Sequence, residues 1–259
     1  MGILKDKWVL ITGASSGFGA AAAIAFAKEG SRLLLGARRV ERLSEVAAKC
    51  RDEGAGAAEV LRLDVGSTPS VEAFAQWVKS KAGKVDVLIN NAGGAHGLDP
   101  VAQGKDEDWE AMMQSNVLGV LRMTRAILPL MQGTKGSILN IGSIAGHVAY
   151  ENGAAYCGAK AAELSITRAL RLELNGTGIR VGTIDPGLAE TEFSMVRFKG
   201  DPAKAAKVYE GVEPLTAEDI AETLVWVASR PPHVCIDEMI IKCTDQAAIH
   251  KVHRRTVTK

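Results

Sequence analysis

The stretch WVLITGASSGFG, residues Trp8–Gly19, decides the fold that we expect for this chain. Its first five residues are apolar or β-branched, as in a buried strand, and an Ala-rich segment typical of a helix begins at Gly17. Gly13, Gly17 and Gly19 let a ligand approach the backbone closely, and free N–H groups at a helix start favour an anion. The stretch therefore predicts a turn that holds the pyrophosphate of a dinucleotide, with a tight turn lacking any ligand as the alternative.

The same alternation of short apolar runs and longer helical segments continues along the chain. The expected strands are Trp8–Thr12, Arg32–Gly36, Glu59–Leu63, Val85–Asn90, Gly136–Ile141, Arg180–Ile184 and Glu238–Lys242. The expected helices are Gly17–Glu29, Val40–Glu53, Pro69–Lys81, Asp106–Met131, Gly153–Leu174 and Ala217–Ser229. Runs such as SILNI do not alternate between polar and apolar residues, as expected of parallel strands covered on both faces. We predict one α/β domain over residues 1–259, a Rossmann-like, doubly wound parallel sheet of seven strands with helices on both faces.

One segment interrupts this alternation, and we call residues 188–214 the lid segment. It contains Gly200, the dipeptide Asp201-Pro202 and two short helical pieces. An insertion of this size after a strand usually covers a binding site, so we expect a small lid over the substrate.

Bulk properties exclude several classes of function. The formal net charge of +1 does not indicate nucleic acid or an anionic membrane as a partner, and no apolar run approaches the ~20 residues that span a bilayer. The four cysteines form no C-x-x-C motif, and His250 and His253 lie in a basic tail, KVHRR, that is expected to be solvated. The chain begins without a basic and apolar leader. We expect a cytoplasmic protein without a metal site.

The end of the second expected strand indicates which dinucleotide is bound. A carboxylate there would accept hydrogen bonds from the ribose of NAD, but the residues are GARR. Arg38 and Arg39 could clamp a 2′-phosphate, and Ser15 could add a hydroxyl. NADP(H) is therefore predicted, with two solvated arginines at a helix start as the alternative.

Two further strand ends lie at the same edge of the expected sheet. Asp64 could accept a hydrogen bond from the adenine amino group. In the sequence NNAG, the small residues Ala92 and Gly93 would let the chain pass close to a ribose.

Tyr156 and Lys160 carry the chemistry. Their Tyr-x-x-x-Lys spacing places both side chains on one face of a helix. A phenol titrates near ~10 in water, and a fixed ammonium beside it favours the phenolate. Ser143, thirteen residues upstream, adds a second hydroxyl for a substrate oxygen. These residues predict hydride transfer to or from a carbonyl carbon, with the proton moved by Tyr156.

In their order along the chain, these motifs resemble the short-chain dehydrogenase/reductase family. The resemblance covers almost the whole chain and rests on TGASSGFG, NNAG, Asn116, Ser143, Tyr156-x-x-x-Lys160 and Pro186-Gly187. It implies that Tyr156 is the acid/base and that Lys160 lowers the pKa of Tyr156 and binds the nicotinamide ribose. It also implies that Ser143 bonds the substrate oxygen and that Asn116 holds a water in a proton relay. The residues expected to bind NADP(H) are Gly13, Ser15, Ser16, Gly17, Phe18, Gly19, Arg38, Arg39, Asp64, Val65, Asn91, Ala92, Gly93, Tyr156, Lys160, Pro186, Gly187, Leu188 and Thr191.

Several stretches, most of them in the last third of the chain, resemble a narrower subgroup, the NADP-dependent 3-hydroxy acid dehydrogenases. The matching stretches are GARRVERL, EFSMVRFKGD, PLTAEDIAE and IHKVHRR. The subgroup oxidises serine and allo-threonine and reduces malonic semialdehyde, and a close branch reduces sulfoacetaldehyde. The resemblance thus implies a small anionic substrate. Arg197 could pair with its carboxylate or sulfonate, with Phe193 and Phe198 closing the pocket. The residues expected to contact substrate are Ser143, His147, Tyr156, Phe193 and Arg197.

Alternatives remain at this stage. Arg197 could be an exposed side chain that packs its stem on the lid segment. The enzyme could reduce a bulkier acyl, sugar or steroid ketone, although IDEMIIKCTDQ replaces the V-D-G-G ending of many such relatives. A non-catalytic NADP-binding sensor is a further possibility. The family resemblance also implies a homotetramer formed through the long helices at Asp106–Met131 and Gly153–Leu174.

Overall fold

A parallel sheet forms the centre of the molecule. The computed structural model describes residues 2–256, and within them seven strands pair in the order β3-β2-β1-β4-β5-β6-β7. Every pairing in this sheet is parallel, which confirms the predicted doubly wound arrangement. The strands are β1 (Trp8–Thr12), β2 (Arg32–Ala37), β3 (Ala57–Arg62), β4 (Val87–Asn90), β5 (Ser137–Ile141), β6 (Arg180–Pro186) and β7 (Glu238–Ile241).

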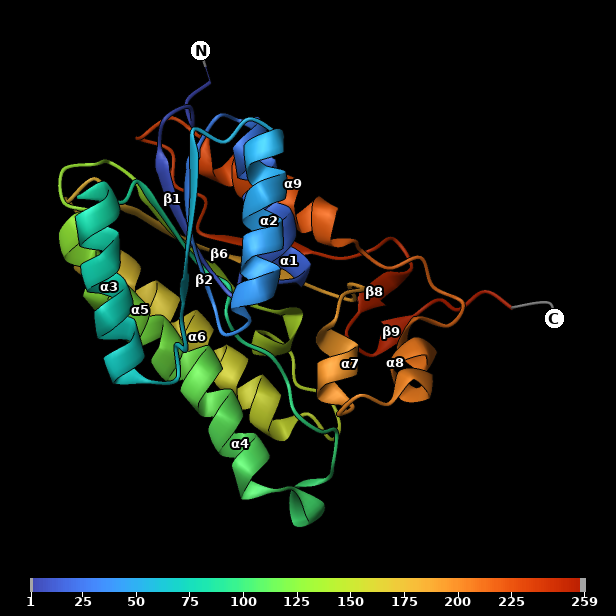
Figure 1. Cartoon of the computed structure of the whole chain (residues 1–259). Coiled ribbons are helices and arrows are strands. Elements are labelled where there is room, and N and C mark those ends of the chain that lie inside the picture. Colours follow the sequence, from blue (N-terminus) through green and yellow to red (C-terminus); the bar gives the residue numbers. More distant parts are fainter. Residues whose placement is uncertain (1, 257–259) are drawn as a thin grey trace.

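Helices cover both faces of the sheet (Figure 1). One face carries α1 (Gly17–Lys28), α2 (Val40–Asp52) and α9 (Ala217–Ala228). The other carries α3 (Thr68–Ala82), α5 (Gly119–Ile127) and α6 (Ala154–Glu173). Strand β1 shows why its sequence does not alternate in polarity. Val9 and Ile11 belong to the first apolar cluster, while Trp8 and Leu10 belong to the second, so every residue faces a helix layer.

The expected helix Asp106–Met131 is interrupted. The structure has α4 (Asp106–Met113), a π-helical turn over Gln114–Leu118, α5 and a final 3-10 turn over Leu128–Leu130. Asn116 lies in the π-helical turn, and its Nδ2 donates to the Met112 carbonyl at 2.9 Å. A side chain that takes a carbonyl of its own helix competes with the backbone ladder, and such wide turns often occur at functional sites.

The lid segment contains two short helices, α7 (Phe193–Arg197) and α8 (Pro202–Tyr209). Its ends are tied together, because Leu215 N–H donates to Leu188 O at 3.0 Å and Glu190 N–H donates to Leu215 O at 2.8 Å. An antiparallel hairpin, β8 (Gln246–Ala248) and β9 (Lys251–Val252), lies beside it (Figure 1).

The hairpin gives the basic tail an ordered backbone, while His250 and His253 are exposed, in agreement with the expectation of solvated side chains. His250 lies in the turn between β8 and β9, and His253 N–H donates to Asp245 O at 2.8 Å. Arg255 N–H donates to Gly211 O at 2.8 Å, and the Arg254 guanidinium donates to Glu210 O and Val208 O. Backbone pairing with the turn after α8 orders a tail whose side chains are polar.

Among residues 2–256, every helix is too short or too polar to cross a bilayer. In the same range, no group of three or more His, Cys, Asp or Glu side chains is arranged to hold a metal ion.

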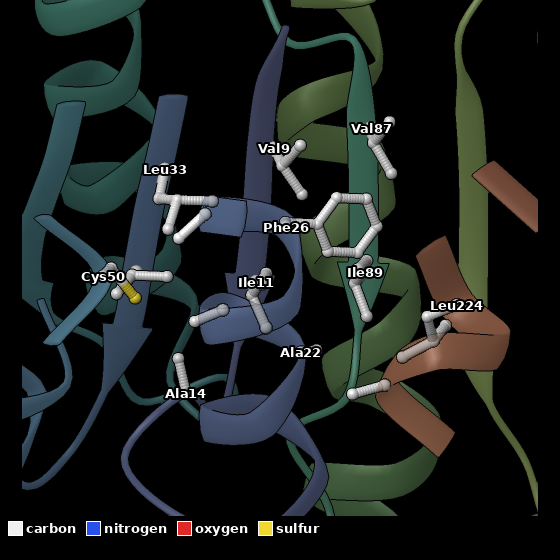
Figure 2. Packing of buried hydrophobic residues seen from close by; sticks show 14 of the residues in the cluster. Val9, Ile11, Ala14, Ala22, Phe26, Leu33, Cys50, Val87, Ile89 and Leu224 are labelled. Atoms are coloured by element: carbon white, nitrogen blue, oxygen red, sulfur yellow. The ribbon is translucent and has the colours of Figure 1, made fainter. Parts of the chain in front are cut away.

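Phe26 of α1 is the largest side chain in the first apolar cluster, and it is fully buried. Figure 2 shows its ring beside Val87 and Ile89 of β4, with Leu224 of α9 nearby. The ring thus fills the space where α1 packs on the strands that form the middle of the sheet.

We predict that Phe26→Ala lowers the free energy of unfolding by about 3–5 kcal/mol, because the cavity cannot fully collapse between two packed layers. Urea denaturation followed by far-ultraviolet circular dichroism measures the change. Val101→Ala, at a side chain that is 63% exposed, is the control and should stay near wild type. Equal midpoints for the two variants would contradict this assignment of the core.

Candidate active site

The site lies where the strand order reverses, at the carboxyl ends of β1 and β4. The Thr12 hydroxyl accepts from Asn91 N–H at 3.0 Å and from Ala92 N–H at 2.9 Å. In return, Asn91 Nδ2 donates to Thr12 O at 2.9 Å. These bonds hold the loop after β4 against the loop after β1 and so build the floor of a crevice.

Glycines make this close approach possible. A Cβ on Gly13 would lie 2.9 Å from Ala92 Cα, and Gly13 has a φ of +67°. A Cβ on Gly19 would lie 2.5 Å from both Asn91 Nδ2 and Gly13 O. Ser16 precedes α1 without capping it through its side chain, so the first N–H groups of α1 remain available to an anion. The turn therefore has the backbone that a pyrophosphate needs.

Arg39 joins this turn to the lid segment. Its guanidinium donates to Ser16 Oγ at 2.6 Å and to Ser15 Oγ at 3.3 Å. A further N–H donates to Glu192 Oε2 at 2.9 Å, and Arg42 pairs with the other oxygen of Glu192. Burial alone would raise the pKa of Glu192, but the hydrogen bonds from Arg42 and Arg39 lower it below its ordinary value. The sequence analysis did not identify Glu192, since nothing local connects residue 192 with residue 39.

Tyr156 and Lys160 lie on α6, and Ser143 follows β5. All three line one cavity of about 870 Å³, as the Tyr-x-x-x-Lys spacing predicts. The Lys160 ammonium donates to Ile141 O at 2.7 Å and to Glu163 Oε2 at 2.6 Å. Burial opposes the charge on Lys160, but Glu163 and Tyr156 outweigh it and raise the pKa of Lys160 above its ordinary value. Glu163 was not predicted either, although its i, i+3 spacing from Lys160 was a usable signal.

Arg197 stands over the aromatic wall of the cavity. Its guanidinium carbon lies 5.2 Å from the Tyr156 ring centre, 5.3 Å from that of Phe193 and 5.6 Å from that of Tyr150. An N–H of Arg197 donates to the Tyr150 hydroxyl. Its buried Nε has no hydrogen-bond partner among the described residues. Tyr150 was not predicted, although it lies only six residues before Tyr156.

Most of the residues expected to bind NADP(H) line this cavity. They are Gly13, Ser15, Ser16, Gly17, Phe18, Arg38, Arg39, Asp64, Val65, Asn91, Ala92, Gly93, Tyr156, Lys160, Pro186, Gly187, Leu188 and Thr191. Among the expected substrate residues, Ser143, Phe193 and Arg197 also line it. Gly19 lies beneath the glycine turn, where it is buried.

Three expected residues lie elsewhere. His147 is not among the residues that line the cavity, and its Nε2 lies 2.7 Å from Asp185 Oδ2. Phe198 follows the last residue of α7 and is not among the residues that line the cavity. Asn116 is buried behind the wall, where its Nδ2 donates to Gly94 O at 2.9 Å and its Oδ1 accepts from Gly94 N–H at 3.1 Å.

Comparisons with known proteins agree with this geometry. The sequence profile of a family described as short chain dehydrogenase matches residues 7–201. The NADP-dependent 3-hydroxy acid dehydrogenase of Schizosaccharomyces pombe is 42% identical over 98% of this chain and 99% of its own length. The serine 3-dehydrogenase of Agrobacterium fabrum is 38% identical over 92% of this chain and 94% of its own. A solved closed form of serine dehydrogenase complexed with NADP+ superposes with a TM-score of 0.89 at 39% identity, covering 96% of this chain and 100% of that one.

Proposed function

The chain belongs to the short chain dehydrogenase family, and on that premise we propose that it is an NADP(H)-dependent oxidoreductase of small 3-hydroxy acids and their carbonyl forms. One observation carries the proposal. A single cavity brings together the glycine turn, the Ser143–Tyr156–Lys160 group and the Arg197 guanidinium. The first part suits a dinucleotide, the second moves a proton, and the third suits an anionic substrate.

The residues of the crevice fit NADP(H). The positive φ of Gly13 and the short Cβ distances at Gly13 and Gly19 leave room only for backbone, and the open start of α1 suits a pyrophosphate. Arg38 and Arg39 would hold the 2′-phosphate with Ser15 and Ser16. When bound, the nicotinamide donates or accepts the hydride.

The protein's own groups handle the proton. Ser143 Oγ accepts from Ala145 N–H at 3.1 Å, which leaves its hydroxyl hydrogen free for the substrate oxygen. In reduction, the Ser143 and Tyr156 hydroxyls stabilise negative charge on that oxygen, and Tyr156 then delivers its proton. In oxidation, Tyr156 takes the proton back. The buried Lys160 ammonium holds a positive charge that interacts with the neighbouring Tyr156. Asn116 supports the crevice through its bonds to Gly94.

The substrate acid group would meet Arg197. The guanidinium is held among three aromatic rings, and its Nε is buried without a partner among the described residues. The carboxylate or sulfonate of a short substrate would pair with the Arg197 guanidinium, while its carbonyl carbon would lie beside Tyr156. The rings of Phe193 and Tyr150 exclude water, which strengthens the ion pair.

We also propose a homotetramer. Helices α4, α5 and α6 expose apolar side chains on the molecule's outer face, which a partner subunit would cover. These side chains are Met113, Leu118, Leu121 and Leu172.

A substrate panel tests the proposed function. It contains serine, allo-threonine, 3-hydroxyisobutyrate, malonic semialdehyde, sulfoacetaldehyde and one bulky ketone, each with NADP(H) and with NAD(H). We expect a small anionic substrate with NADP(H) to exceed the bulky ketone in kcat/KM by roughly 10-fold or more, because pocket size and charge discriminate at the transition state. NADPH absorbance measures the rate. A bulky ketone as the best substrate, or equal use of NAD(H), would overturn the assignment.

Tyr156→Phe removes only the phenolic oxygen. We predict that kcat falls by about 10²–10⁴-fold, since a general acid/base is lost, while the Kd for NADPH stays within a factor of about three. Steady-state absorbance assays measure kcat, and NADPH fluorescence titration measures the Kd. Tyr209→Phe, at a tyrosine whose hydroxyl bonds Ser194 and Ala189 O in the lid segment, is the matched control. Near wild-type turnover by Tyr156→Phe would refute the mechanism.

Arg197→Ala tests the anion contact. We expect the KM for malonic semialdehyde to rise by roughly 10–100-fold, the equivalent of losing a hydrogen bond between charged groups. The KM for butanal, a neutral aldehyde, should change little. Lys204→Ala, at an exposed lysine of α8, is the control. An unchanged KM for the acidic aldehyde would show that Arg197 only packs within the lid segment.

A further inference from the structure

A buried carboxylate, that of Glu163, lies beside the ammonium of Lys160. Glu163 stands one helical turn after Lys160 on α6, and it is only 1% exposed. Its Oε2 lies 2.6 Å from Lys160 Nζ. Its other oxygen, Oε1, is buried and has no hydrogen-bond partner among the described residues.

Fold stability does not account for this arrangement. Burial raises the pKa of Glu163 to about 7 even though an ammonium lies against it. A buried ion pair is often no more stabilising than apolar residues of the same volume, because both charges lose their hydration. Glu163 loses its hydration at a position beside Tyr156, the residue that moves the proton. We therefore expect Glu163 to affect the reaction rather than the stability of the fold.

Counting donors shows what Glu163 does to Lys160. An ammonium has three N–H donors. Ile141 O accepts one at 2.7 Å, and Glu163 Oε2 accepts another. The remaining donor is thereby directed toward the cavity that Lys160 and Tyr156 line.

We propose that Glu163 is a positioning residue, which orients the Lys160 ammonium and sets the net charge beside Tyr156. The proposal rests on the proposed function, in which Tyr156 moves the substrate proton. Without Glu163 the ammonium would have one protein acceptor and a full positive charge. With Glu163 ionised, the pair beside Tyr156 is close to neutral.

Other ionisable groups surround the pair. Helix α6 supplies Tyr156, and strand β6 supplies Asp185, whose charge acts on both Lys160 and Glu163. Asp185 is itself engaged, by Thr183 Oγ1 at 2.6 Å and by His147 Nε2 at 2.7 Å. The exposed Arg168–Glu238 pair lies farther out, between α6 and β7, where solvent screens it. Removal of Glu163 leaves all of these groups in place.

The direction of the effect follows from the sign of the removed charge. A negative charge nearby makes both Tyr156 and Lys160 hold their protons more tightly, so its removal lowers the pH at which each loses one. Because the pKa of Glu163 is itself raised to about 7, wild type carries this negative charge only above that pH. Wild type and a neutral variant should therefore agree at lower pH and diverge at higher pH.

Glu163→Gln tests the charge and keeps an acceptor oxygen for Lys160. The chain has three tyrosines, so the phenolate absorbance of each protein is titrated and the same titration of its Tyr156→Phe derivative is subtracted. We expect the Tyr156 phenolate to form at a lower pH in Glu163→Gln than in wild type, because a negative charge has been removed. Glu173→Gln, at an exposed glutamate of the same helix, is the control and should show no shift. An unshifted Tyr156 titration in Glu163→Gln would overturn the proposal.

This titration needs neither cofactor nor substrate, so its result is independent of the substrate panel. In active protein, the pH profile of kcat for alcohol oxidation should also move to lower pH in Glu163→Gln. Glu163→Asp, which keeps the charge but shortens the side chain, should leave the profile in place and lower kcat several-fold. If Glu163→Gln fails to fold, Glu163→Asp is the deciding variant. A kcat of Glu163→Asp equal to that of wild type at every pH would refute the positioning role.

Discussion

The hydroxyl of Thr12 makes the contact on which the rest of the site depends. It sits at the end of β1, donates to Ile89 O and accepts from the two N–H groups of Asn91 and Ala92. Buried N–H groups need such partners, so this one side chain decides how closely the loops after β1 and β4 approach. Gly13 can then pass against Ala92, and the start of α1 opens into the crevice. The floor of the crevice is thus built by the ends of β1 and β4 and the loops that follow them, without the lid segment.

Charged groups are placed around this crevice in pairs. Lys160 is matched by Glu163, and Arg39 by Glu192, while Arg197 keeps a buried nitrogen without a partner among the described residues. The short helix α7 connects two of these places, because Glu192 precedes it and Arg197 ends it. A displacement of α7 would therefore change both the contacts of Glu192 with Arg39 and Arg42 and the contact of Arg197 with the ring of Tyr156. This coupling gives the lid segment a physical link to both halves of the proposed reaction.

Local sequence patterns predicted the regular elements well, and the interruptions show what such patterns omit. Each strand of the parallel sheet begins and ends within two residues of its predicted bounds, because apolar runs and glycine turns are encoded locally, whereas β8 and β9 were not predicted. The helix expected over Asp106–Met131 instead contains a π-helical turn, because the Asn116 amide takes the Met112 carbonyl and also holds Gly94. Gly94 lies 22 residues away in the sequence, so periodicity alone could not reveal that competition.

The amino-acid sequence by itself determined the order of strands and helices, the glycine turn and the face shared by Tyr156 and Lys160, since each depends on neighbours a few residues apart. Only the tertiary structure decided which other side chains reach them. It placed His147 beside Asp185, brought Arg197 over the rings of Tyr150 and Tyr156, and set Glu192 against Arg39. The physical reason is that helical spacing specifies a face of a helix, whereas the packing of distant segments specifies what that face meets.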